Sequence, residues 1–226
     1  MEDDDIIIRR YHALMVLGII LPFLIFPFLS MVFLSASQSD AYRFIFSRFL
    51  IWAELGLVLL YARYGEVQRF FLWDEERYDF GFFLKWIIAL YLLVMACGIA
   101  ASIPHWLGLH ERNDVSNRML KTMRLYPLSI VFAAFTAGVT EEFIFRGYII
   151  SRLSLLLKNK HLPVIISALL FMCIHLGYKN IGELIFTFLF GVVFGYHYQK
   201  YRNIMVLVTV HALWDFLAMF AAIHHK

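Results

Sequence analysis

IVFAAFTAGVTEEFIFRGYII, residues 130–150, is the stretch that decides what kind of fold this chain adopts. As an α-helix rising about 1.5 Å per residue, it is long enough to cross the roughly 30 Å hydrocarbon core of a bilayer. Three ionisable residues, Glu141, Glu142 and Arg146, nevertheless lie inside this apolar stretch. On insertion scales each charge at the bilayer centre costs roughly 2.5–3.5 kcal/mol, so three together require a reason. The stretch therefore predicts a membrane-spanning helix that carries a polar site.

Apolar runs follow one another along the whole chain. Of its 226 residues 62% are hydrophobic, 18% aromatic and only 16% charged, with a mean hydropathy of +0.71. This composition leaves too little polar surface to cover a water-soluble globule. About seven spans are expected, at His12–Leu34, Phe44–Tyr64, Phe82–Ile103, Pro127–Leu157, Pro163–Tyr178, Ile181–Tyr198 and Ile204–Ile223.

These runs predict an all-α, polytopic transmembrane helix bundle that forms a single integral membrane domain over residues 1–226. Residues 1–126 supply the N-terminal helices, and residues 127–223 supply the helices with unusual polar residues. The first run follows the acidic start MEDDD and is longer than the apolar core of a usual signal peptide, so we expect it to remain as the first span. The polar stretch Pro104–Arg124 is compatible with an amphipathic interfacial helix and equally with an extramembrane loop.

Several functional classes are excluded or disfavoured. The net charge of +3 is spread over short connections, which excludes the concentrated basic surface of a nucleic-acid binder. Cys97 and Cys173 lie in apolar runs without CxxC spacing, so neither a disulfide framework nor a thiolate zinc site is indicated. Gly191 and Gly195 form a GxxxG pattern, which predicts close helix packing.

The two adjacent acids of the fourth span, Glu141 and Glu142, are expected to lie in different environments. Glu142 and Arg146 are at positions i and i+4, so they share a helix face and can neutralise each other. A buried ion pair that fixes helix register is a sufficient explanation for these two residues. Glu141 projects about 100° away from Glu142 and lacks that partner. Burial then favours its protonated form, which suits a group that takes up and returns protons.

Two later spans bring further polar groups to a similar depth. FMCIH places Phe171 and His175 at i and i+4, and HALWD places His211 and Asp215 at the same spacing. Counted from the turn near residues 158–160, Glu141 and His175 both lie roughly 22–26 Å along their helices, so a hairpin sets them at one level. Each histidine could instead be a satisfied core residue, with His211 bonded only to Asp215. A single site shared by the three spans explains why each of them carries polar residues at this depth. Glu54 and Glu183 either line a cavity or pair between helices, and structural roles are favoured for both.

EEFIFR at residues 141–146, FMCIH at 171–175 and HALWD at 211–215 resemble the motifs of the CPBP, or Abi, family of intramembrane proteases, which includes CAAX-processing endopeptidases. The family patterns are EExxxR, FxxxH and Hxxx followed by Asn or Asp, in this order on three late helices. The resemblance covers roughly residues 127–223 and implies a glutamate-dependent peptide hydrolase without a metal or other cofactor.

The resemblance also implies roles for individual residues. Glu141 and His175 would hold and activate a water, while His211 and Asp215 would stabilise the oxyanion; Arg146, Glu142 and Phe171 would support them. CAAX-type members carry Asn at the last position, and Asn can donate to an oxyanion, whereas an ionised Asp can only accept. Asp215 therefore either stays protonated and donates, or orients His211.

The expected substrate is a peptide or a membrane-associated protein cut internally or near a C-terminus, and the expected setting is the lipid bilayer of a prokaryotic plasma membrane. Three other interpretations remain open. His175, His211 and Glu141 are the ligand types of a catalytic zinc site, although HExxH is absent. A non-catalytic scaffold or immunity-type protein could retain the polar core for other reasons. A proton-coupled transporter could use the same groups, but no inverted repeat is visible.

Overall fold

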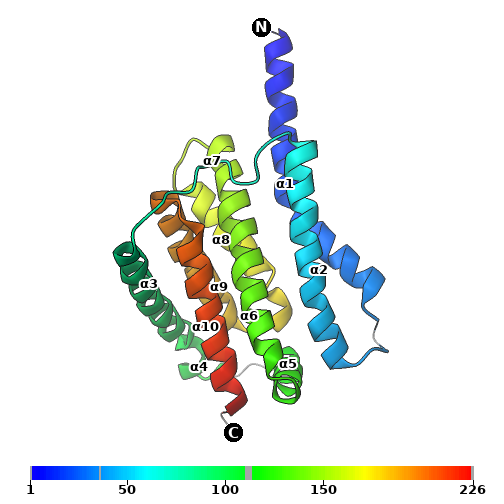
Figure 1. The fold of residues 1–226 in the computed structure, drawn as a ribbon, viewed down its shortest axis with the longest axis vertical. Helices are drawn as coiled ribbons and strands as arrows, with labels where there is room; N and C mark the ends of the chain where they lie inside the picture. The colour runs from blue at the N-terminus through cyan, green and yellow to red at the C-terminus, as the bar shows by residue number, and fades with distance from the viewer. Residues whose placement is uncertain (1, 36, 110–113, 225–226) are drawn as a thin grey trace.

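The computed structural model describes residues 2–35, 37–109 and 114–224, and in these ranges every regular element is a helix (Figure 1). Six helices are long and apolar enough to cross a membrane: Ile8–Phe33, Asp40–Gly65, Phe80–Trp106, Leu128–Leu156, Ile181–Tyr201 and Ile204–His224. A shorter apolar helical segment, Leu162–Tyr178, follows the fourth of these helices in the chain. The prediction of an all-α polytopic bundle with about seven spans is confirmed.

The helical elements in chain order are α1 (Glu2–Phe33), α2 (Asp40–Leu60), η1 (Tyr61–Gly65), α3 (Phe80–Ala101), α4 (Ile103–Trp106), α5 (Asp114–Leu125), α6 (Leu128–Glu142), η2 (Phe143–Ile150), α7 (Ser151–Leu156), α8 (Leu162–Cys173), η3 (Leu176–Tyr178), α9 (Ile181–Tyr201) and α10 (Ile204–His224). The elements α6, η2 and α7 form one continuous span in which η2 is a wider π-helical segment. This span packs against α10 and α2, and its η2 segment packs against α8 and α9.

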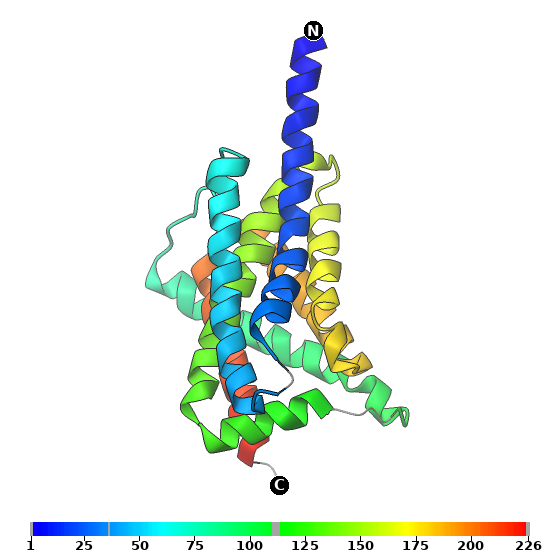
Figure 2. The same cartoon turned by 90° about the vertical axis from the view of Figure 1, so that its right-hand side faces the viewer.

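The connections at the two ends of the bundle are built differently. At one end, α5 lies across the helix ends beside α2, α6 and α10, where Met123 is buried with Phe44 and Ile130 (Figure 2). The polar stretch after Pro104 is therefore helical over Asp114–Leu125, while residues 110–113 lie outside the described part.

At the other end, residues 66–79 form an extended connection, here called the strap, that runs across the bundle before α3 (Figure 1). Its first residue, Glu66, is buried and pairs with Arg152 of α7 at 2.7 Å. Near its other end the Glu76 N–H donates to the Arg202 carbonyl at 2.8 Å. The strap is thus tied to helices on both sides of the bundle.

Small residues decide how closely α8 and α9 approach each other. A Cβ at Gly191 would lie 2.9 Å from the Ala168 Cα, and a Cβ at Gly195 would lie 2.8 Å from the Val164 Cγ1. Side chains larger than hydrogen would push the helices apart at both positions. The predicted packing role of this GxxxG pattern is confirmed.

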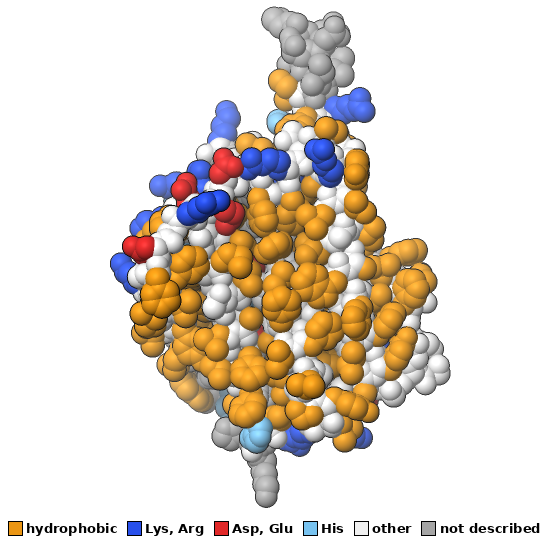
Figure 3. Space-filling view, viewed as in Figure 1, with side chains coloured by type: hydrophobic (Ala, Val, Ile, Leu, Met, Phe, Trp, Pro, Cys, Tyr) orange, Lys and Arg blue, Asp and Glu red, His pale blue; other side chains and the backbone are white. Residues whose placement is uncertain are grey.

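The surface matches the composition. Large apolar side chains cover the middle of the bundle, and charged side chains gather toward its ends (Figure 3). Such a broad apolar belt is stable only in contact with lipid. The chain is an integral membrane protein.

Candidate active site

The site begins where α6 meets the π-helical segment η2. Glu142 is the last residue of α6, and the π-helix η2 begins at the next residue. Short π-helical segments within α-helices are frequent at functional sites. One turn earlier, a Cβ at Gly138 would lie 3.0 Å from the Ala212 Cβ and from the Val208 carbonyl oxygen on α10. Gly138 therefore lets α10 approach α6 closely enough for its polar residues to reach Glu142.

Glu142 is the centre of a buried three-residue network. Its Oε1 accepts from Arg146 Nη1 at 3.0 Å, so the predicted i, i+4 pair is confirmed. The same oxygen also bonds His211 Nδ1 at 2.7 Å, across the α6–α10 contact. A carboxylate can only accept, so Nδ1 of His211 carries the proton of this bond. The interpretation that His211 is bonded only to Asp215 is therefore wrong, because its hydrogen bond goes to Glu142.

Arg146 is held against aromatic rings. Its guanidinium carbon lies 4.6 Å from the Phe171 ring centroid, 5.6 Å from that of Phe194 and 5.7 Å from that of Phe190. Cation–π attraction strengthens in a desolvated site. Phe171, predicted as a supporting residue, therefore contacts the cation that neutralises Glu142. The second oxygen of Glu142 and the Nη2 of Arg146 have no hydrogen-bond partner among the described residues.

His175 lies just beyond the end of α8. The predicted span from Pro163 to Tyr178 matches the apolar helical segment Leu162–Tyr178, in which the α-helix ends at Cys173 and a 3₁₀ turn follows. The His175 backbone N–H bonds the Met172 carbonyl, and its ring Nδ1 bonds the Phe171 carbonyl at 2.9 Å. The ring thus takes the place of the backbone donor that would continue the helix. Since a carbonyl can only accept, Nδ1 carries the proton and Nε2 of the neutral ring is left as an acceptor.

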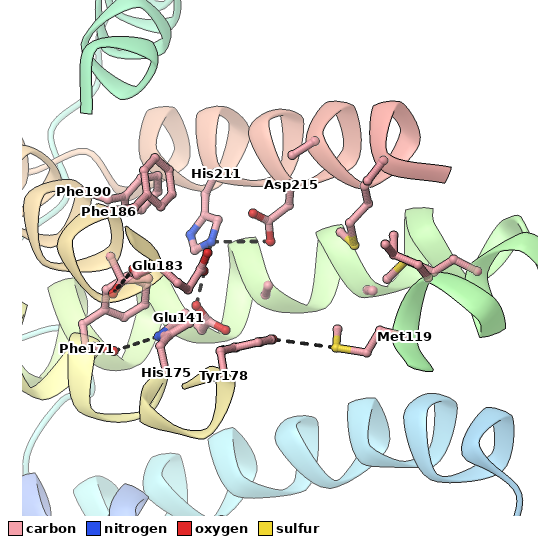
Figure 4. Close-up of a pocket in the computed structure, with 18 of the residues that line it drawn as sticks. Met119, Glu141, Phe171, His175, Tyr178, Glu183, Phe186, Phe190, His211 and Asp215 are labelled. Atoms are coloured by element: carbon pink, nitrogen blue, oxygen red, sulfur yellow. Dashed lines mark hydrogen bonds and ion pairs between the residues drawn. The ribbon is translucent and has the colours of Figure 1, made fainter. Parts of the chain in front are cut away.

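These groups surround one cavity of about 340 Å³ (Figure 4). Its lining includes Glu141, His175, His211 and Asp215, which the sequence predicts to be the catalytic residues, and Phe171. The Nε2 of His211 lies 3.8 Å from Glu141 Oε2 and 3.7 Å from Asp215 Oδ2, so both carboxylates adjoin the imidazole without a direct hydrogen bond. The cavity is far larger than the roughly 30 Å³ share of one water.

Glu141 and Asp215 differ from Glu142 in solvent access. Their side chains are 19% and 28% exposed, whereas Glu142 is fully enclosed. The two neighbouring acids of EEFIFR therefore occupy a cavity wall and a dry network respectively, as their 100° separation predicts.

Three ionisable residues of the cavity lining were not identified as site residues from the sequence. Arg48 of α2, Tyr178 of η3 and Glu183 in the first turn of α9 all line the cavity. Glu183 therefore lines the cavity, which is one of the two placements considered for it from the sequence. A cation inside the apolar run of α2 was a usable signal for Arg48. Glu54, buried on the same helix, is absent from the lining.

No group of three His, Cys, Asp or Glu side chains among the described residues is arranged to hold a metal ion. The ligand set considered from the sequence, His175, His211 and Glu141, shares the cavity without forming such a cluster.

Comparisons with known proteins fall on the same helices. Residues 123–217 match the family described as "Type II CAAX prenyl endopeptidase Rce1-like". A protein of Bacillus subtilis (strain 168) with the curated name "Putative membrane peptidase YdiL" is 26% identical over 163 residues. That alignment covers 71% of this chain and 64% of the relative, so the chain spans slightly less than two thirds of the relative's length. No solved structure gives a significant match. The matched region contains all three polar motifs, so residues 123–217 are similar to the CAAX endopeptidase family where the candidate site lies.

Proposed function

We propose that this protein is an intramembrane endopeptidase that hydrolyses a peptide bond in a membrane-associated peptide or protein. The observation that carries the proposal is the convergence of Glu141, His175, His211 and Asp215, from three helical segments, on one cavity within the bundle. A substrate cut near its C-terminus is consistent with the description of the matching family.

In the first step Glu141 removes a proton from a water, and the resulting hydroxide forms a C–O bond with the carbonyl carbon of the substrate. His175 orients this water. With its Nδ1 proton bonded to the Phe171 carbonyl, its Nε2 accepts the other hydrogen of the same water. A fixed base and a fixed water reduce the entropy that the reacting groups lose at the transition state.

The carbonyl oxygen becomes negatively charged as the tetrahedral intermediate forms. His211 acts here in its protonated form, donating Nδ1–H to Glu142 and Nε2–H to the oxyanion. Asp215, as a neutral carboxylic acid, supplies a second donor on the same side of the cavity. The proton held by Glu141 then passes to the amide nitrogen, the C–N bond breaks, and the free base is restored.

Glu142 and Arg146 act through His211. Because Glu142 fixes the Nδ1 side of the imidazole, Nε2 is directed toward the cavity. Arg146 pairs directly with Glu142, and aromatic rings pack around Arg146. These residues are positioning residues in this mechanism.

The test is cleavage of quenched fluorogenic peptides by purified protein, using one peptide with a farnesylated Cys-aliphatic-aliphatic-X terminus and the same peptide without lipid. Glu141→Gln should lower kcat by about 10²–10⁴-fold, the usual contribution of general acid–base catalysis. Glu76→Gln is the control, because it removes an exposed carboxylate of the strap that does not line the cavity.

Equal cleavage by wild type and Glu141→Gln would reject the glutamate mechanism. Loss of activity in a chelator, restored by zinc, would favour the metalloprotease interpretation. A biological role that persists fully in the Glu141→Gln and His175→Ala variants would identify a non-catalytic protein.

A further inference from the structure

A second hollow, distant in sequence from the catalytic motifs, lies at the strap end of the bundle. It has a volume of about 570 Å³ and lies where the α7–α8 connection, the C-terminal turn of α9 and the strap meet. We call it the basic groove, after its four cationic side chains Lys158, Lys160, Lys200 and Arg202. The remaining lining residues are neutral or aromatic, apart from His161, and none is acidic: Trp73, Ser154, Leu157, Asn159, His161, Pro163, Tyr196 and Gln199.

The position of the basic groove along the membrane normal follows from the spans that border it. Two apolar spans end there, at Leu156 and Tyr201, and two helical segments begin there, at Leu162 and Ile204. The groove therefore lies at the level where hydrocarbon gives way to lipid headgroups. Trp73 and Tyr196 in its lining are the amphipathic aromatic residues typical of that level.

The groove is shaped by neutral contacts that leave its cations available. His161 Nδ1 lies 2.9 Å from the Tyr196 hydroxyl, and Gln199 Nε2 donates to the Lys160 carbonyl at 2.8 Å. The guanidinium of Arg202 lies 5.3 Å from the Trp73 ring centroid. In the described part of the chain, no acidic side chain forms an ion pair within 4 Å with any of the four cations.

Cations near the C-terminal ends of α7 and α9 also complement the helix dipoles, which is reason enough for one lysine at each end. That effect does not require cations from two separate connections to border the same hollow. Their convergence concentrates positive potential where the phosphates of a bilayer lie.

We propose that the basic groove binds the phosphate of an anionic lipid headgroup, with Lys158, Lys160, Lys200 and Arg202 as its cationic contacts. The ammonium groups provide point charges, and the Arg202 guanidinium, oriented against Trp73, provides a planar donor pair. The polar amides of Asn159 and Gln199 border the same space and can contact a glycerol headgroup. This site is separate from the proposed peptidase activity.

The test is native mass spectrometry of the full chain in detergent, titrated with phosphatidylglycerol and, separately, with phosphatidylcholine. We compare wild type with the triple variant Lys158→Gln/Lys160→Gln/Lys200→Gln. Phosphatidylglycerol affinity should fall about tenfold to a hundredfold in the variant, since each interfacial cation strengthens the attraction to anionic lipid several-fold. Weak binding of phosphatidylcholine should be unchanged.

Two further variants keep the result interpretable. Arg9→Gln/Arg63→Gln/Arg77→Gln removes the same charge from exposed positions outside the groove and should retain wild-type affinity. Lys158→Arg/Lys160→Arg/Lys200→Arg preserves the charge and should also bind. Equal loss in both glutamine triples would overturn the groove assignment. Displacement of the lipid by inorganic phosphate at millimolar concentration would overturn the assignment to lipid in favour of a free-phosphate site.

Discussion

Glu142 accepts hydrogen bonds from both Arg146 and His211 through the same oxygen, Oε1. This arrangement distinguishes Glu142 from its neighbour Glu141. Glu142 is enclosed and neutralised, so it serves to position the imidazole. Glu141, one residue earlier, faces the cavity beside His211 Nε2 at 3.8 Å. A rotation of about 100° along one helix is therefore sufficient to give neighbouring glutamates different environments.

At Asp215 the geometry favours a donor role over an orienting role. The imidazole of His211 is already oriented by Glu142, and the 3.7 Å separation from Asp215 exceeds hydrogen-bond distance. Asn at this position would donate through its amide, so Asp215→Asn should keep kcat within about tenfold of wild type, whereas Asp215→Ala should lose about 10²–10³-fold as one oxyanion donor disappears. Steady-state cleavage rates measure both. Comparable losses in the two variants would show that the negative charge of Asp215 is what the reaction needs.

At the scale of elements, the strap forms two ion pairs: Glu66 with Arg152 is buried, and Arg69 with Asp74 is exposed. Arg152 of α7 donates to Glu66 Oε2 from Nε and Nη2 and also to the carbonyls of Arg69 and Phe70, all around a fully enclosed pair. Tyr148 of η2 adds a hydrogen bond to Glu66 Oε1 at 2.6 Å. In contrast, the Arg69–Asp74 pair within the strap is largely exposed, with side chains 66% and 86% accessible.

This difference predicts unequal effects on stability. Arg152→Gln leaves the Glu66 carboxylate buried without its cation and should lower the free energy of unfolding by about 3–5 kcal/mol. Arg69→Gln removes an exposed pair and should cost less than about 1 kcal/mol. Unfolding in detergent, followed by circular dichroism, compares them. A small effect of Arg152→Gln, equal to that of Arg69→Gln, would mean that the strap does not depend on the buried pair.

At the scale of the whole molecule, the chain crosses the bundle an odd number of times. The six long spans and the shorter segment Leu162–Tyr178 alternate in direction, and the two termini lie at opposite ends of the molecule (Figure 1). The cavity lined by Glu141 and His175 reaches toward the end that α5 covers, since Met119 and Met123 of α5 contribute to its lining. The basic groove lies near the other end of the bundle, where the strap crosses it.

Opposite termini predict a labelling pattern in intact membranes. In a background with Cys97→Ser and Cys173→Ser, Arg9→Cys and His224→Cys should react with a membrane-impermeant maleimide from opposite sides, because seven passes separate them. Right-side-out and inside-out vesicles, analysed by mass shift, make the comparison. Reaction of both cysteines from the same side would mean that the segment Leu162–Tyr178 does not cross.

Local features of the sequence were sufficient for the fold class and for several of the polar residues that line the candidate cavity. Hydropathy identifies spans because the bilayer requires about 20 apolar residues per helix, and the i, i+4 spacing of Glu142 and Arg146 already determines that they share a face. The common depth of Glu141 and His175 also follows from counting residues along two antiparallel helices. These inferences depend on distances within one helix or one hairpin, which the sequence specifies directly.

Contacts between helices were decided only by the tertiary structure. The bond from His211 to Glu142 depends on how closely α10 approaches α6 at Gly138, and the end of α8 at Cys173 depends on the His175 ring turning back to the Phe171 carbonyl. Arg48 and Glu183 reach the cavity because α2 and α9 pack with a particular rotation. Rotation and approach are set by the packing of many side chains at once, so residue spacing along a single helix cannot determine them.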